Sequence, residues 1–477
     1  MNKLVVFSIK IIPFIIIFPF VYFFDLAFRN PVKSEQIPAT LAISSFDTPI
    51  ITNNNSNLDL YTSFDATIER FVRKWDLAGT SIAIARNGKL VYAKGFGYAN
   101  KETEEKMQPY HMLRIASVSK LITAVAIMKL VENGQINLNQ KVFGKKGILN
   151  EPIYLEYLDP RIEDITVKHL LNHSAGWTTR WGDHLFMHQS IARQTEKELP
   201  ISNDDIICFA LSKRLHFNPG SRSSYNNLGF TILEKIIERK TCRSYENYVQ
   251  ENIFKPLGIN DAFIANNFDT LRYPQEVRYY EVPEAELVPA YNGQQVMLLK
   301  SRGGNDIRYL GAAGGWVISS VSLIKFLLDI DSDNPNGITL LQRYSKVLEQ
   351  VEPGKHPLGW RWISSNGDKW RTGSFAGTSA LAINRKDGFT YVFLTNCSPW
   401  VGSKFPYEVN KMMTIAIQRV DQWPDFDLLD PSSVYKRINL PFMANFFSPP
   451  KKNKELLTVK ESLTSYCKGE NREVYYF

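Results

Sequence analysis

The first strongly apolar run of the chain lies near its N-terminus. Ile11–Phe24 carries no charge, and Lys3 and Lys10 precede it. Such a run behind basic residues is typical of a signal sequence or a short membrane anchor. No small-x-small cleavage site follows it, which favours an anchor whose N-terminus faces the cytoplasm. We therefore expect residues 1–28 to be a signal or membrane anchor and the body to be exported, in the periplasm or at the cell surface.

Strand patterns occur at both ends of the body. Residues 80–86 and 89–94 are β-forming segments on either side of Asn87-Gly88, a dipeptide that favours a two-residue hairpin turn. Later strand patterns lie at 358–364, 369–373, 379–384 and 389–396, with an Asp387-Gly388 turn before the last. These segments predict one antiparallel sheet built from both ends of the chain.

Helical periodicity fills the space between the strands. A helix is expected at 64–75, another at 407–420, and mostly helices and loops from 139 to 320. The fold class is therefore mixed α and β (α+β), an antiparallel sheet flanked by helices with an inserted helical lobe.

Four regions follow from these patterns. Residues 29–58 are rich in Pro, Ser, Thr and Asn, which is typical of a linker that holds a folded body off a membrane. Residues 59–420 form the expected compact domain. Residues 421–477 show no strong period and receive no role.

Composition excludes several classes of protein. Lys and Arg number 56 and Asp and Glu 48, a net charge of +8 that is scattered along the chain and argues against a nucleic-acid partner. The four cysteines are too few for a disulfide scaffold, and they have no Cys-x-x-Cys spacing that would indicate a zinc site. His169 and His173 stand four apart but lack the glutamate of a zinc protease helix, and no complete nucleotide-binding loop occurs. We expect no metal and no cofactor.

Candidate chemistry centres on Ser117 and Lys120. The Ser-x-x-Lys spacing occurs five times, so spacing alone is weak evidence. Only the copy at Ser117 opens an apolar run, Leu121–Met128, which predicts an amphipathic helix that Gly134 can close. On such a helix the hydroxyl and the amine share one face, close enough to exchange a proton.

Two further segments belong with this pair. In the extended loop around Tyr225, that residue and Asn227 point the same way, toward a shared cleft. The segment Arg371-Thr372-Gly373-Ser374 ends a predicted strand, where glycine lets a substrate backbone approach. The backbone N–H groups of Ser117 and Ser374 are candidates to hold an oxyanion.

Taken in order, Ser-x-x-Lys, Tyr-x-Asn and basic-Thr-Gly resemble the serine β-lactamase and penicillin-binding protein superfamily. The resemblance is greatest to the branch of class C β-lactamases, D-Ala-D-Ala carboxypeptidases and esterases. The segments 165–176, 256–259 and 314–320 are similar to this branch as well, and the likeness runs from about residue 61 to 420. It implies a β-lactamase/transpeptidase-like fold and a small-molecule or peptide substrate.

The resemblance also implies site roles. Ser117 would attack an amide, ester or β-lactam carbonyl, and Lys120 and Tyr225 would share the proton transfers, with either one as the base. Asn227 would orient Lys120 and the substrate amide, and an extended substrate would pair with the strand after Gly373.

One departure concerns Arg371, where the family usually has Lys or His. A guanidinium keeps its proton and matches a carboxylate with its fork, so Arg371 would serve anion recognition or electrostatic support, or mark a drift toward other substrates. The alternative to a hydrolase is a non-hydrolytic, envelope-anchored recognition or scaffold domain. The substrate and the oligomeric state stay open.

Overall fold

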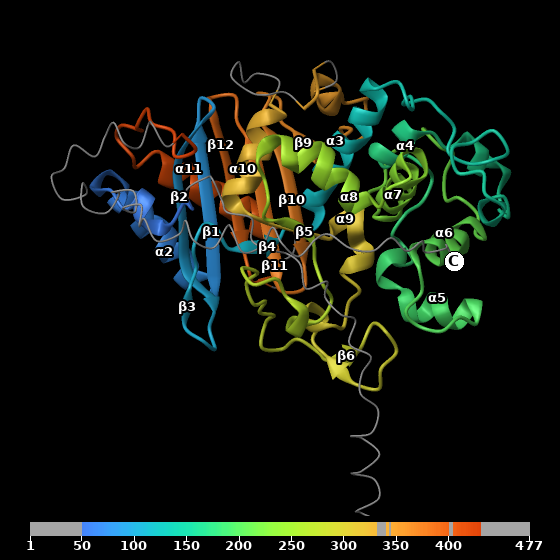
Figure 1. Ribbon diagram of the computed structural model, residues 1–477, viewed down its shortest axis with the longest axis horizontal. Coiled ribbons are helices and arrows are strands. Elements are labelled where there is room, and N and C mark those ends of the chain that lie inside the picture. The colour runs from blue at the N-terminus through green and yellow to red at the C-terminus, as the bar shows by residue number, and fades with distance from the viewer. Residues whose placement is uncertain (1–49, 332–339, 343–344, 400–403, 431–477) are drawn as a thin grey trace, which may run out of the picture. The chain divides into compact units, whose positions relative to one another are not determined.

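A seven-stranded antiparallel sheet forms the centre of the molecule (Figure 1). The computed structural model describes residues 50–331, 340–342, 345–399 and 404–430. In the sheet the strands follow the order β3-β2-β1-β12-β11-β10-β9. Their bounds are β1 Gly79–Arg86, β2 Lys89–Asn100, β3 Glu105–Lys106, β9 Trp362–Ile363, β10 Lys369–Phe375, β11 Thr378–Asn384 and β12 Phe389–Thr395. Strands from the two ends of the body thus meet at β1 and β12, as the sequence predicts.

The predicted hairpin joins β1 to β2. Asn87 and Gly88 have φ values of 49° and 80°, the left-handed pair that suits a tight turn between twisted strands. The Asn87 N–H donates to the Gly388 carbonyl at 2.8 Å, which links this turn to the one before β12. Both predicted turns therefore lie at the same end of the sheet.

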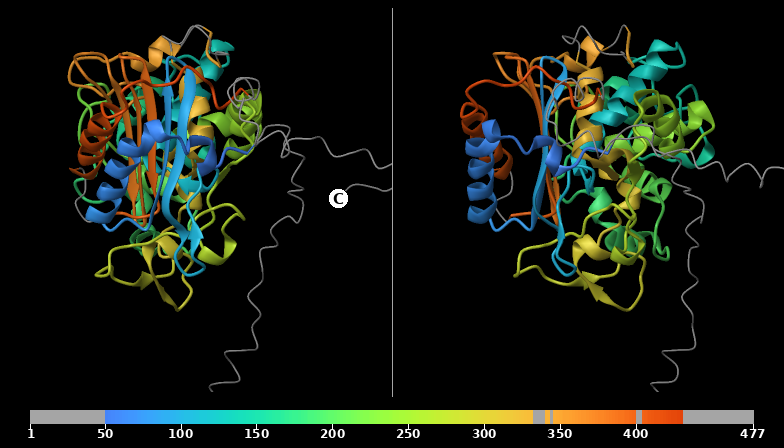
Figure 2. Two further views of the ribbon diagram at one scale, coloured as in Figure 1. Left: turned by 90° about the vertical axis from the view of Figure 1, so that its left-hand side faces the viewer. Right: turned by 60° about the vertical axis from the view of Figure 1, so that its left-hand side comes forward.

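Helices cover both faces of the sheet (Figure 2). Helices α2 and α11 pack together on one face, and α10 packs on β1 and β12 from the other. The helices are α2 Thr62–Lys74, α3 Ser119–Glu132, α4 Val167–Leu171, α5 His188–Thr195, α6 Asn203–Leu211, α7 Leu228–Thr241, α8 Tyr245–Val249, α9 Gly311–Gly314, α10 Ser320–Asp329 and α11 Lys404–Ile417. Most helices between α3 and α10 form the predicted inserted lobe, which confirms the fold class.

Two small sheets were not predicted. Strands β4 (Met112–Arg114), β8 (Trp316–Ser319) and β5 (Ala262–Ile264) pair in that order, and β6 (Val288–Pro289) pairs with β7 (Met297–Leu298). These strands have two to four residues each, and β8 is buried throughout. Such short segments carry no alternation from which a strand could be recognised.

The strand predicted at 358–364 is shorter than expected. Only Trp362 and Ile363 pair with β10, because the preceding residues turn away and contact other segments. The Gly359 N–H donates to the Leu348 carbonyl, and the neighbouring Trp360 is buried. The edge of the sheet next to most of β10 is therefore left open by β9.

Helix α3 is buried on nearly every side, so the amphipathic helix predicted there is wrong. All residues from Ser119 to Met128 are buried, because α7, α8 and α9 of the inserted lobe pack around the helix. The predicted end of the helix is confirmed, since Gly134 follows the cap residue Asn133 with φ +69°.

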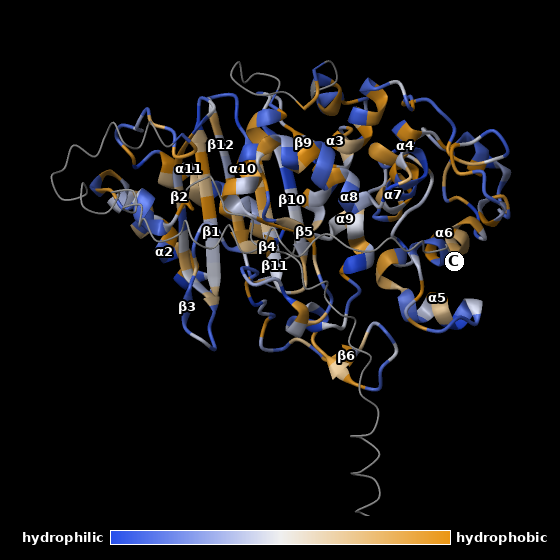
Figure 3. Cartoon of the chain, viewed as in Figure 1, coloured by the Kyte–Doolittle hydropathy of each residue, from blue (hydrophilic) through white to orange (hydrophobic). Residues whose placement is uncertain are grey.

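The hydrophobic colouring of Figure 3 lies along β1 and α11, while the loops at the rim are hydrophilic.

The described chain continues to pack beyond residue 420. Trp423 is 7% exposed and contacts the rings of Tyr61, Phe64 and Phe389. The predicted anchor, residues 1–28, and most of the linker lie outside the described residues. Within the described ranges, every helix is too short or too polar to cross a bilayer.

Candidate functional site

Ser117 lies in a short 3-10 turn, η3 (Ala116–Val118), between β4 and α3. Ala116 has φ +47°, a left-handed conformation that an alanine adopts only at a cost of about 1–2 kcal/mol. The turn brings Ser117 to the N-terminal end of α3, where its side chain is partly exposed. The strained backbone thus lies directly before the candidate nucleophile.

Lys120 lies at the start of α3, one helical turn after Ser117, and is fully buried, at 0% exposure. Its Nζ donates to the Ser117 Oγ at 3.2 Å and to the Asn227 Oδ1 at 2.6 Å. A third hydrogen bond goes to the backbone carbonyl of Ala313. Three acceptors on three different elements therefore hold the amine against Ser117.

Burial lowers the pKa of Lys120 below its ordinary value, because the charged amine has lost its water. The charge of Arg371 acts in the same direction, while Tyr225 and Asp183 oppose it. The balance moves the amine toward the neutral form that can accept a proton.

Tyr225 lies against Lys120, with the amine 5.2 Å from the ring centroid. Burial works against its ionised form, but the charges of Lys120 and Arg371 outweigh burial and lower the pKa of Tyr225 to about 8. Hydrogen bonds with Ser117 and Lys120 act the same way. Tyr225 therefore has both the position and the acidity of a group that exchanges a proton with Ser117 near neutral pH.

Three more residues frame Tyr225, and of these the sequence singled out only His173, which was weighed there as a metal ligand. The Arg361 guanidinium lies 4.1 Å from the Tyr225 ring centroid, and the His173 ring lies 4.4 Å from it. His356 packs against both rings. No local spacing relates these residues to Tyr225, so the fold alone reveals them. The cation over the ring face further favours a phenolate.

Asn227 connects Lys120 to a second loop. Its Oδ1 accepts from Lys120, and its Nδ2 donates to the Asp183 Oδ2 at 2.7 Å. Asp183 also caps the short helix η6 (His184–Phe186). The carboxylate thereby fixes the orientation of the amide, so that the oxygen faces the lysine.

Arg371 points inward, toward the serine turn. Its Nε donates to the Ser117 carbonyl at 2.9 Å and its Nη1 to the Gly359 carbonyl at 3.2 Å. The side chain is 2% exposed, burial lowers its pKa to about 10, and its Nη2 has no partner in the described structure. Two of its nitrogens therefore hold the backbone of the site, and the buried Nη2 is left for a ligand or water.

The other residues of this segment, Thr372, Gly373 and Ser374, lie within β10. Gly373 lies so near the serine turn that a Cβ would come 2.1 Å from the Ile115 carbonyl oxygen and 2.9 Å from the Ser117 nitrogen. The close neighbour that requires glycine is thus the serine turn itself, whereas a substrate backbone was expected. Thr372 is partly exposed and Ser374 exposed. Because β9 pairs only with Lys369 and Trp370, this half of β10 has no partner from β9.

The other copies of the Ser-x-x-Lys pattern differ in surroundings. Ser322, in α10, is buried and hydrogen-bonds to Asp261. The copies at Ser433, Ser448 and Ser465 lie outside the described residues. Of the copies that the structure describes, the one at Ser117 is joined by a hydrogen bond from its own lysine.

The two histidines weighed as metal ligands have other partners. His169 Nδ1 accepts from the Thr166 N–H, and His173 Nδ1 accepts from the Asn226 N–H. Among the described residues, no group of three or more His, Cys, Asp or Glu side chains could hold a metal ion.

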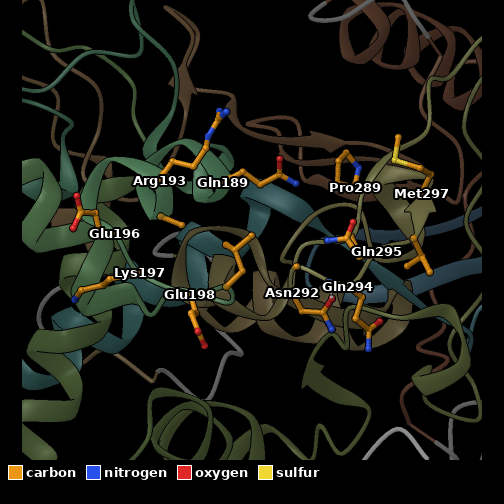
Figure 4. Close-up of a pocket in the computed structure, with 15 residues that line it drawn as sticks. Gln189, Arg193, Glu196, Lys197, Glu198, Pro289, Asn292, Gln294, Gln295 and Met297 are labelled. Atoms are coloured by element: carbon orange, nitrogen blue, oxygen red, sulfur yellow. Dashed lines mark hydrogen bonds between the residues drawn. The ribbon is translucent and has the colours of Figure 1, made fainter. Parts of the chain in front are cut away.

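A pocket of about 790 Å³ lies between α5 and the β6–β7 hairpin (Figure 4). Gln189 and Arg193 line it from α5, and Asn292, Gln294 and Gln295 from the hairpin. Its α5 wall follows directly after the segment whose carboxylate bonds Asn227. Amides and charges thus gather beside the loop that holds the site.

Known proteins resemble most of this chain. A family model described as Beta-lactamase matches residues 64–407. Protein flp of Staphylococcus aureus (strain MRSA252) is 30% identical over 344 residues, which is 71% of this chain and 63% of that protein. Penicillin-binding protein 4* of Bacillus subtilis (strain 168) is 28% identical over 354 residues, 72% of each chain. The chain therefore spans less than two thirds of the flp protein's length.

Solved structures agree on the fold. The structure of the octameric penicillin-binding protein homologue from Pyrococcus abyssi superposes with a TM-score of 0.56 and 25% identity. The match covers 76% of this chain and 77% of that one.

Proposed function

Because the chain belongs to the β-lactamase family, we propose that it is a serine hydrolase that forms an acyl-enzyme at Ser117. Its substrates would carry amide, ester or β-lactam carbonyls. The observation that carries the proposal is the single hydrogen-bonded group in which the Lys120 amine joins Ser117 to Asn227. A buried amine aimed at a partly exposed hydroxyl is the arrangement that activates a serine.

In the proposed reaction the Ser117 Oγ forms a bond to the carbonyl carbon as its proton passes to Tyr225 or Lys120. The same group then delivers the proton to the leaving nitrogen or oxygen as that bond breaks. Water repeats the sequence on the ester and frees the serine. The lowered pKa values of Lys120 and Tyr225 support both groups as proton carriers near neutral pH.

Arg371 would act chiefly as electrostatic support. It carries a fixed charge against Tyr225, and it holds the carbonyl of Ser117 in place. Its free Nη2 would add one hydrogen bond to an anionic substrate or to the transition state. The N–H groups of Ser117 and Ser374 would hold the oxyanion.

Among the possible substrates, a peptide-like one has the most support. The half of β10 beyond β9 offers strand pairing to an extended chain. We infer a carboxypeptidase-type or amidase-type activity ahead of a simple esterase.

We also propose that residues 1–28 attach the protein to a membrane, with the domain on the outer side. The uncharged run behind Lys3 and Lys10 supports this. Membrane fractions from cells that express the full chain should contain it, and a chain that starts at residue 51 should appear in the soluble fraction.

The activity is tested by incubating the full chain with a fluorescent penicillin and with a chromogenic ester, followed by mass spectrometry. We expect an adduct on Ser117 that Ser117→Ala abolishes. Ser322→Ala removes another serine of the same pattern and should keep the adduct. Stable labelling without turnover of either substrate would support the non-hydrolytic recognition domain, and the absence of any adduct would contradict the proposal.

A further inference from the structure

The short helix α9 presents backbone groups to two different neighbours. It packs against both α3 and α7 (Figure 1). Its Ala312 carbonyl accepts from the Thr123 Oγ1 at 2.8 Å, and its Ala313 carbonyl accepts from the Lys120 Nζ. Lys120 and Thr123 are one turn apart on α3, so two successive carbonyls of α9 hold the helix that carries the lysine.

The N–H end of α9 is held by Glu234. The Glu234 Oε2 accepts from the Ala312 N–H at 2.8 Å. A Cβ on Gly311 would lie 2.1 Å from this same oxygen, so a larger residue there would displace the carboxylate from its present position. Two residues therefore contribute to this contact: Glu234 on α7 supplies the carboxylate, and Gly311 at the start of α9 leaves space beside it.

Glu234 and Asn227 reach the lysine from one helix. Asn227 caps α7 and accepts directly from Lys120, and Glu234 follows seven residues later, two turns along the same face. Two of the three acceptors around the Lys120 amine therefore depend on α7, one directly and one through α9.

We infer that Glu234 is a positioning residue, which holds α9 so that the Ala313 carbonyl keeps the Lys120 amine aimed at Ser117. The inference rests on the proposed acyl-serine function and adds a residue to it. Loss of the contact leaves α9 free to shift, and a shift of the carbonyl loosens the amine. A displacement of about 1 Å at the reacting groups lowers rates by roughly 10²-fold.

The contact depends on pH. Burial and the charge of Glu238 on the same helix raise the pKa of Glu234 to about 7, although Ala312, Lys235 and Asn203 favour the ionised form. The other groups that face this region are Asp204 on α6, Tyr245 and Glu246 on α8, and Arg308 before α9. The carboxylate accepts a hydrogen bond from the Ala312 N–H more strongly than the protonated acid does. As the pH falls through 7, Glu234 therefore holds α9 less firmly, and α9 positions the Lys120 amine less firmly.

The test measures the rate of acylation of the full chain by the fluorescent penicillin between pH 5.5 and 9. Glu234→Ala should lower this rate by roughly 10-fold to 100-fold at pH 8. Glu234→Gln should stay within about 3-fold of the original protein at pH 8, because its amide oxygen can still accept from Ala312. Asn203 Nδ2 donates to the Glu234 Oε1 at 3.2 Å, so the new amide nitrogen can donate to the unpartnered Asn203 Oδ1 once the Asn203 amide has turned over.

The pH profile separates positioning from mere stability. The original protein should lose rate below pH 7 in addition to any change near pH 8, and Glu234→Gln should lack the lower step. Glu238→Gln, on the same helix and in a partly exposed ion pair with Lys235, should keep the lower step but move it to lower pH, because the charge of Glu238 raises the pKa of Glu234.

Two outcomes overturn the inference. One is a Glu234→Ala variant that is acylated as fast as the original protein, and the other is a Glu234→Gln profile that keeps the lower step. If Glu234→Ala does not fold, the Glu234→Gln profile decides alone. A protein that is never acylated would instead contradict the proposed function, so the two failures are distinct.

Discussion

Three cationic side chains lie around Tyr225: Lys120, Arg361 and Arg371. Burial opposes the ionisation of Tyr225, but the charges of Lys120 and Arg371 and the hydrogen bonds with Ser117 and Lys120 lower its pKa to about 8. Arg361 lies over its ring. A phenol in water titrates near 10. The phenolate is therefore accessible at physiological pH, which makes Tyr225 the better candidate of the two for the base.

We expect Tyr225→Phe to lower the acylation rate by roughly 10²-fold to 10⁴-fold, because the proton carrier is lost while the ring remains. In the original protein the rate should rise with pH through about 8, since the ionised form of Tyr225 accepts the proton. Stopped-flow acylation at a series of pH values measures both effects. The exposed Tyr407→Phe is the control, and an unchanged rate in Tyr225→Phe would assign the base to Lys120.

Gly373 offers a second prediction at this scale. In Gly373→Ala the new methyl group would overlap the Ile115 carbonyl and approach the Ser117 nitrogen, so β10 or the serine turn must move. We expect acylation to fall by roughly 10²-fold and stability by about 1–3 kcal/mol. Labelling and thermal unfolding measure the two effects. Full activity in this variant would show that the turn tolerates displacement.

Sequence order was enough to select the residues that meet at the site. Ser117, Lys120, Tyr225 and Asn227 come together as predicted, although their catalytic roles stay predictions. Asp183, Arg361, Ala313 and Glu234 could not be selected in the same way. They act through long-range contacts, or in one case through a backbone carbonyl, and neither leaves a local pattern in the sequence.

At the scale of elements, α3 shows how context overrides pattern. The apolar run after Ser117 predicts a helix, and the helix is present, but its burial depends on layers that lie far away in sequence. The two hairpin turns were predictable because they require particular backbone conformations at Asn87, Gly88 and Gly388. Strands of two or three residues were not, because their pairing is decided by neighbours.

The end of α3 yields a prediction about conformation alone. Gly134 has φ +69°, and a Cβ there would meet no atom within 4 Å. Gly134→Ala should therefore cost about 1 kcal/mol through its left-handed backbone, and Gly134→Asn should cost less. Denaturant unfolding measures both values. Gln135→Ala, the exposed neighbour, should stay within about 0.5 kcal/mol, and equal effects at 134 and 135 would contradict the explanation.

At the scale of the whole molecule, the last described segment secures the outer layer of the sheet. Trp423 packs between α2 and β12, against the rings of Tyr61, Phe64 and Phe389. A boundary at residue 420 leaves this side chain out of the compact body, because a single tryptophan in an aperiodic segment gives no sign of where it packs.

We expect Trp423→Ala to lower the free energy of unfolding by about 3–5 kcal/mol, as for other large buried aromatic residues. Trp181, which is 71% exposed, provides the control, and Trp181→Ala should change stability little. Thermal or denaturant unfolding of the full chain measures the difference. A small effect at Trp423 would show that the segment is only loosely attached.

The pairing of β1 with β12 has a consequence for the order in which the protein folds. The middle of the sheet can form only after residues 389–395 have been made and have paired with residues 79–86. Contacts so far apart in the chain form late and slowly. During synthesis Ser117 emerges long before β10, the strand against which its turn packs. A growing chain therefore carries Ser117 without a finished site, and the proposed chemistry can begin only once nearly the whole domain has been made.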